Sequence, residues 1–114
     1  MHKLVILIEM LENWQEFESR WPEFLHLVEI LPGLQREATS RVEHFLYGNT
    51  PVAQMHELFF KTQAEAEQAL MTPAGQAAGR LLQQITGGRL LLFFAEHKED
   101  DLENIRKFMP PTEV

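Results

Sequence analysis

The chain has 114 residues, the length of a single domain, and 45% of them are hydrophobic, enough to build a core. Its 17 acidic and 10 basic side chains give a net charge of −7, which disfavours nucleic acid as a partner. The lack of cysteine excludes disulfides, thiolate nucleophiles and every metal site that needs sulfur.

The longest apolar runs, residues 4–8 and 90–95, are far shorter than the roughly 20 residues of a membrane-spanning helix. The first of them is also too short for the apolar region of a secretory signal. We therefore expect no membrane partner and a cytoplasmic location.

The first third of the chain predicts a strand followed by a helix. Residues 4–8 are continuously apolar, as in a strand that is buried on both faces. Asn13 offers a helix cap, and apolar side chains then recur at steps of three and four residues. This spacing predicts an amphipathic helix over 14–30, ended by Pro32 and Gly33.

The middle of the chain predicts a β-hairpin. Residues 34–46 alternate between wetter and more apolar positions, so they predict a long strand with one wet face. Residues 47–51 contain Gly, Asn and Pro and predict a turn. Residues 52–61 form the returning strand.

The last third predicts helices, a strand and a short tail. Thr62 and Glu65 have the spacing of a capping box, which opens a helix. A threonine followed by proline opens a further helix over about 73–84, ended by two glycines. Residues 89–97 predict the fourth strand. Acids followed by bases predict a short helical tail over about 99–109.

This order of elements predicts an α+β fold of the ferredoxin-like βαββαβ type, a four-stranded antiparallel sheet with its helices on one face. However, both faces of the first and last strands are apolar, and a monomer would expose one of them. We therefore expect a homodimer that buries the face carrying Val5, Leu7, Leu91 and Phe93, or their even-numbered alternates. The tail around 102–108 is expected to strap the partner.

Four stretches, taken in order, resemble the EthD-like proteins of the dimeric α+β barrel superfamily over nearly the whole chain. They are Lys3–Leu7, Leu31–Leu34, Glu57–Phe60 and Thr72–Ala77. The resemblance implies one EthD-like domain over 1–114, a homodimer whose two sheets close a barrel, and a small apolar pocket between each sheet and its helices. It also implies no cofactor. Relatives include cofactor-independent monooxygenases, cyclases and decarboxylating enzymes that act on aromatic or polyketide-like compounds.

One position departs from the family pattern. EthD-like proteins usually carry a histidine in the first helix, eight residues before the proline of the Pro-Gly turn, and this chain has Phe24 there. The substitution removes a donor, an acceptor and a base together. We expect Phe24 to face the sheet and to make the pocket dry, which favours ligand binding or modest catalysis.

His44 and His56 are the candidate catalytic residues. Both occupy even positions on the predicted hairpin, as does Ser40, and a register that pairs Leu46 with Val52 would place both imidazoles on one face. A neutral imidazole can act as a general base without a cofactor. The alternative is that both are ordinary sheet histidines.

Phe17, Trp21 and Phe24 are expected to line the ligand pocket together with Ser40. The three aromatic residues equally fit plain core packing, and the two interpretations are compatible because a pocket wall is also core. His26 falls opposite the apolar stripe and is expected at the surface. No His pair has helical ligand spacing, so we expect no metal.

The sequence therefore predicts a small dimeric protein with an apolar pocket for a small organic molecule, aromatic or polyketide-like. It would bind this molecule or carry out modest cofactor-independent oxidoreductase chemistry of the monooxygenase type. The alternatives are a non-catalytic structural or ligand-sensing dimer, and a cyclase- or decarboxylase-type enzyme that uses pocket histidines.

Overall fold

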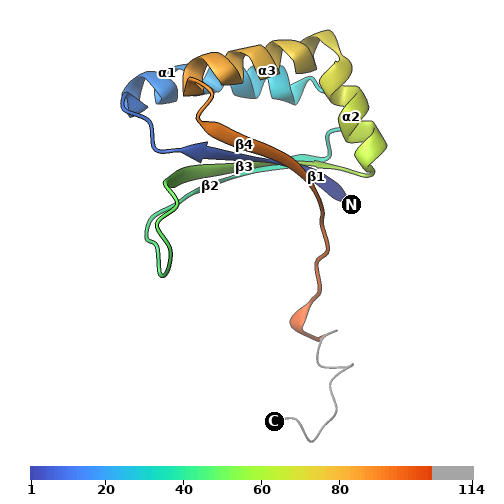
Figure 1. Cartoon of the computed structure of the whole chain (residues 1–114). Coiled ribbons are helices and arrows are strands. Elements are labelled where there is room, and N and C mark those ends of the chain that lie inside the picture. Colours follow the sequence, from blue (N-terminus) through green and yellow to red (C-terminus); the bar gives the residue numbers. More distant parts are fainter. Residues whose placement is uncertain (104–114) are drawn as a thin grey trace, which may run out of the picture.

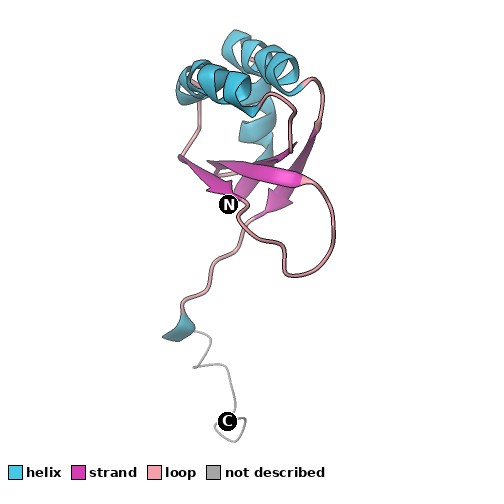
Figure 2. Ribbon diagram, turned by 90° about the vertical axis from the view of Figure 1, so that its left-hand side faces the viewer, coloured by secondary structure: helices cyan, strands magenta, loops and turns pink. Residues whose placement is uncertain are grey.

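The computed structural model describes residues 1–103, so most of the tail helix predicted over 99–109, and the strap around 102–108, lie outside the described residues. Three helices cover one face of a four-stranded sheet, and within residues 1–103 no helix packs against the other face (Figures 1 and 2). All strand pairs are antiparallel, in the order β2-β3-β1-β4. The predicted α+β, ferredoxin-like fold is confirmed. The elements are β1 (His2–Glu9), α1 (Trp14–Glu29), β2 (Arg36–Arg41), β3 (Val52–Phe60), α2 (Gln63–Met71), α3 (Pro73–Thr86) and β4 (Leu90–Glu96).

Local signals fix the ends of the helices. The Asn13 side chain accepts a hydrogen bond from the backbone N–H of Glu16 at the start of α1. Thr62 caps α2 in the same way, and Thr72 caps α3 directly before its first proline. Gly87 ends α3 in the left-handed conformation, with φ 62°, which a residue without a Cβ adopts at little cost.

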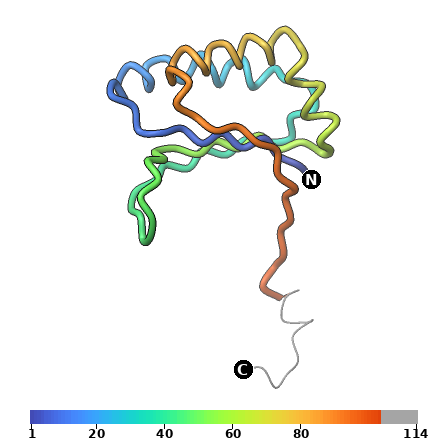
Figure 3. The backbone as a smooth tube through the Cα atoms, viewed as in Figure 1, coloured from blue at the N-terminus to red at the C-terminus, as the bar shows by residue number. Residues whose placement is uncertain are grey.

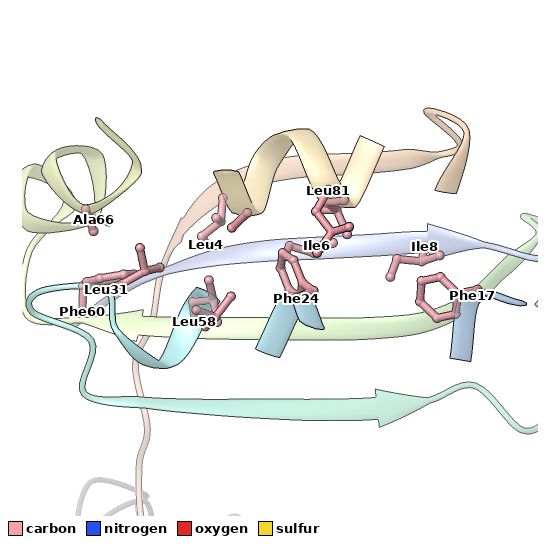
Figure 4. Packing of buried hydrophobic residues seen from close by; sticks show 14 residues of the cluster. Leu4, Ile6, Ile8, Phe17, Phe24, Leu31, Leu58, Phe60, Ala66 and Leu81 are labelled. Atoms are coloured by element: carbon pink, nitrogen blue, oxygen red, sulfur yellow. The ribbon is translucent and has the colours of Figure 1, made fainter. Parts of the chain in front are cut away.

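The core lies between the helices and the even-numbered side chains of β1. Figure 4 shows Phe24 against the sheet beside Ile6, and Phe17 beside Ile8. The odd-numbered side chains point to the helix-free face. There Leu91 and Phe93 of β4 are 58% and 44% exposed. The apolar face that the helices leave uncovered is therefore the odd-numbered one.

The hairpin differs from the prediction. The strand predicted over 34–46 is shorter, since β2 ends at Arg41. Arg41 pairs with Gln54, so the register that would place Leu46 opposite Val52 does not form. Residues 42–51 form a wide loop that projects away from the helices (Figure 3). Among the described residues, no strand lies beside the hairpin beyond the end of β1, and Leu46 is 94% exposed. The turn residues therefore predicted where the chain reverses, but not how many residues the loop contains.

Candidate functional site

His56 is fully buried on the helix side of β3, with an exposed fraction of 0%. Helix α1 covers its imidazole with two aromatic side chains. The Trp21 ring lies edge-on at 5.1 Å and the Phe24 ring at 6.1 Å, measured between ring centroids. A buried titratable ring enclosed by aromatic residues needs its polar atoms satisfied from elsewhere.

Strand β2 supplies both partners of the His56 ring. Thr39 Oγ1 is 2.7 Å from Nδ1, and Glu37 Oε2 is 3.1 Å from Nε2. An ionised carboxylate can only accept, so Nε2–H donates to Glu37 and Nδ1 accepts from the Thr39 hydroxyl. The tautomer is thus assigned from the partners. A connected Glu37–His56–Thr39 network results, able to hold or pass a proton.

Burial lowers the pKa of His56 below its ordinary value of 6.5. The hydrogen bond and charge of Glu37, and the charge of Glu57, partly offset this effect. Because desolvation is the largest cause, the imidazole is neutral at neutral pH. In that state it can accept a proton.

A cavity of about 400 Å³ lies next to this network, bounded by α1, α3, β1 and β4. Its wall is apolar except at Gln76, whose side chain is polar. Gly75 sits in the wall at the junction of α2 and α3, where a Cβ would come within 2.3 Å of the Ala69 carbonyl oxygen. Among the lining side chains are Leu4, Ile6, Phe24, Leu82, Leu92 and Phe94.

Phe24 connects the cavity to the network, because its ring lines the cavity and also contacts His56. His56 itself does not reach the cavity wall. A molecule in the cavity therefore meets the imidazole only if the Phe24 side chain moves. The Phe24 ring therefore separates the cavity from the imidazole.

The structure does not bring all the predicted site residues together. His56 and Phe24 are in contact, and Trp21 lies over His56. The predicted common face of His44 and His56 is wrong, because His44 is exposed in the loop after β2. Ser40 pairs with Met55 and so lies on the helix-free face, away from the cavity.

Phe17 and Trp21 line a second hollow on the opposite flank of α1 rather than the apolar cavity. Both also pack in or against the core. The His26 side chain is 82% exposed, at the surface as expected.

Sequence reasoning missed Glu37 and Thr39. Both are alternate residues of β2 that face the helices opposite Leu58 and His56. Their alternation is visible in the sequence, but only the correct hairpin register shows that they reach an imidazole.

Within residues 1–103, no three or more His, Asp or Glu side chains gather closely enough to hold a metal ion. In the same part of the chain, no helix is long and apolar enough to cross a membrane.

No family model matches the chain, and no curated protein matches it. Solved structures do. An EthD family protein from Bacillus halodurans C-125 shares 26% identity, with a TM-score of 0.79 over 86% of this chain and 99% of that one.

Two further structures have lower identity. A dimeric ferredoxin-like protein of unknown function from Jannaschia sp. CCS1 is 19% identical, with a TM-score of 0.63 over 84% of this chain and 97% of that one. SnoaB, a cofactor-independent oxygenase from Streptomyces nogalater, is 14% identical, with a TM-score of 0.63 over 89% of this chain and 95% of that one.

These likenesses define an α+β protein of the ferredoxin-like class. Within that class, the predicted resemblance to the EthD-like proteins is confirmed.

Proposed function

We propose that the protein binds a small, largely apolar organic molecule, aromatic or polyketide-like, in the cavity between α1, α3 and β4. The observation that carries the proposal is the composition of this cavity, about 400 Å³ with a nearly continuous apolar wall. Ligand sites are typically apolar hollows of this size with a few polar groups. The position of Phe24 in the wall supports a dry site, because a phenyl ring packs there without a hydrogen-bond partner.

We further propose that the functional unit is a cytoplasmic homodimer, joined through the helix-free face of the sheet. Leu91 and Phe93 are exposed on this face, next to Leu7 and Met55. The loop 42–51 and residues 97–103 both leave the sheet on this side, where they would flank a second copy (Figure 1). The name of the Jannaschia protein, described as dimeric, supports the same assembly.

Modest cofactor-independent oxygenase chemistry is the second part of the proposal, with His56 as the base. Its support is the Glu37–His56–Thr39 network and the activity named for the Streptomyces protein. Because His56 lies behind Phe24, turnover would be slow unless the ring moves aside. The alternatives are a non-catalytic structural or ligand-sensing dimer, and a cyclase- or decarboxylase-type enzyme.

Gly79 offers the sharpest test of the cavity. It lines the cavity, and a Cβ built on it meets nothing within 4 Å. Gly79→Leu should therefore fill the mouth of the cavity, whereas Gly79→Ala should improve helix propensity and leave the space open. We would titrate the full chain and both variants with the neutral fluorophore N-phenyl-1-naphthylamine. We expect the Leu variant to bind at least about tenfold more weakly than the Ala variant, as the loss of a well-filled apolar site implies. Equal binding by the two variants would contradict the proposal.

A further inference from the structure

A second hollow lies on the other flank of α1, between that helix and the β2–β3 pair. Its volume is about 360 Å³. It shares no lining residue with the apolar cavity, and the stacked rings of Trp21 and Phe24, with centroids 4.9 Å apart, stand over His56 between the two. The lining residues are Phe17, Glu18, Trp21, Pro22, Arg41 and Gln54.

Gln54 is the feature of this hollow that packing alone does not explain. The residue is only 3% exposed, and its buried Nε2 has no hydrogen-bond partner among residues 1–103. Leaving a buried amide N–H unpaired is costly, and an apolar side chain of similar length would avoid that cost. Gln54 lines the hollow, so a turn of its amide about the Cγ–Cδ bond would present this donor to an acceptor supplied by a ligand.

The aromatic side of the hollow comes from α1. The Phe17 and Trp21 rings pack with their centroids 5.3 Å apart and their planes at 37°. The Trp21 indole also makes an edge-to-face contact with the His56 imidazole. Trp21 is partly exposed, so the indole is accessible from the hollow. A flat ring of a ligand would find an aromatic neighbour here.

The charge at the mouth of the hollow is already balanced. Arg41 forms a 2.7 Å ion pair with Glu18 Oε1, and Trp14 Nε1 donates to the same oxygen at 2.8 Å. A ligand carboxylate would compete with Glu18 for the guanidinium and be repelled by the Glu18 charge. A neutral acceptor meets neither obstacle, so the hollow favours a carbonyl group over an acid.

We propose that this hollow is a second binding site, which takes a neutral aromatic ketone. The ring of the ketone lies against Trp21, and its carbonyl oxygen accepts a hydrogen bond from Gln54 Nε2. The site is independent of the apolar cavity, which carries no comparable buried donor in its wall. A molecule with a ketone and an apolar body would therefore be recognised differently on the two flanks of α1.

The test compares two ligands with the same ring system. The full chain, labelled with ¹⁵N, is titrated with 1-tetralone and, separately, with tetralin, which lacks the carbonyl. We expect the ketone to shift the Gln54 side-chain amide signals and to bind about tenfold more tightly, since one hydrogen bond to a buried donor is gained. If a water molecule accepts the hydrogen bond of the amide instead, the two compounds bind with equal affinity, and the proposal is wrong. This comparison needs no variant.

Gln54→Met then removes the donor at nearly constant length. We expect tetralone binding to fall to the level of tetralin, with no loss of thermal stability, because Nε2 has no partner to lose. The matched control is Gln76→Met in the wall of the apolar cavity, which should leave tetralone binding unchanged. A lower Tm for Gln54→Met, or unchanged tetralone affinity in that variant, would overturn the proposal. Binding of N-phenyl-1-naphthylamine should be the same in Gln54→Met and in the unaltered chain, which separates this site from the apolar cavity.

Discussion

The Phe24 ring stands edge-to-face against the His56 imidazole, with centroids 6.1 Å apart and ring planes at 72°. The helix position where EthD-like proteins usually carry a histidine is thus filled by a phenyl ring, and an imidazole lies beneath it on β3. Both residues are almost fully buried. The contact keeps the imidazole dry and closed off from the cavity.

Phe24→Leu should loosen this closure. The smaller side chain loses the aromatic contact with His56 and Trp21, and we expect a loss of about 1–2 kcal/mol in the free energy of unfolding. Water would reach the imidazole more easily, so the pKa of His56 should rise toward its ordinary value. An NMR titration of the His56 ring protons measures that pKa directly. An unchanged pKa in the variant would mean that Phe24 does not control the solvation of His56.

The depressed pKa of His56 makes the stability of the protein depend on pH. Because the folded state binds the proton less readily than the unfolded state, acid favours unfolding. Stability should therefore be full above the ordinary pKa of 6.5 and should decline as the pH falls below it. We would measure denaturant unfolding between pH 5 and pH 8 for the unaltered chain, for His56→Gln and for the surface control His26→Gln.

The decline should weaken in His56→Gln and persist in His26→Gln, whose ring is 82% exposed. The same decline in both variants would assign the pH dependence to other groups.

Neighbouring residues of β2 give a test of the hairpin register. Thr39 donates to His56 Nδ1, whereas Ser40 lies on the opposite face of the sheet. Thr39→Val leaves a buried ring nitrogen without a partner and should cost about 1–3 kcal/mol of unfolding free energy. Ser40→Ala should stay within about 0.5 kcal/mol of the unaltered chain. Chemical denaturation measures the unfolding free energy of both variants. A larger loss of unfolding free energy for Ser40→Ala than for Thr39→Val would require a different register of β2 and β3.

The proposed homodimer would depend on Phe93 of β4. Its side chain is 44% exposed on the helix-free face, and a lysine there would bury an unpaired charge in the proposed interface. We expect sedimentation to show a dimer for the unaltered chain at micromolar concentration and a monomer for Phe93→Lys. Leu46→Lys is the matched control, since Leu46 is 94% exposed in the loop and should tolerate the change. A monomeric unaltered chain would rule out the assembly.

The sequence was sufficient for the order of elements and for most of their ends. Caps at Asn13, Thr62 and Thr72 act through bonds to residues three positions away, so local sequence contains both partners. The apolar residues on both faces of β1 likewise indicated one face against the helices and a second face that needs cover. These features depend on neighbours in the chain or on simple periodicity.

The candidate site was harder to predict because it depends on strand register. His56 was identified, but its partners Glu37 and Thr39 reach it only when Thr39 pairs with His56. A shift by an odd number of residues sends every side chain of β2 to the other face, which is why Ser40 was misplaced. Turn composition located the chain reversal between β2 and β3, but it did not indicate that their pairing ends at Arg41 and Gln54.

We propose above that the cavity between α1, α3 and β4 holds an apolar ligand. The most direct measurement is of intermolecular NOEs between bound N-phenyl-1-naphthylamine and the isotope-labelled full chain. We expect NOEs from the probe to the methyl groups of Leu82 and Leu92 and to the Phe24 ring, all of which line the cavity. Binding with NOEs only to residues outside the cavity wall, or no binding, would contradict it.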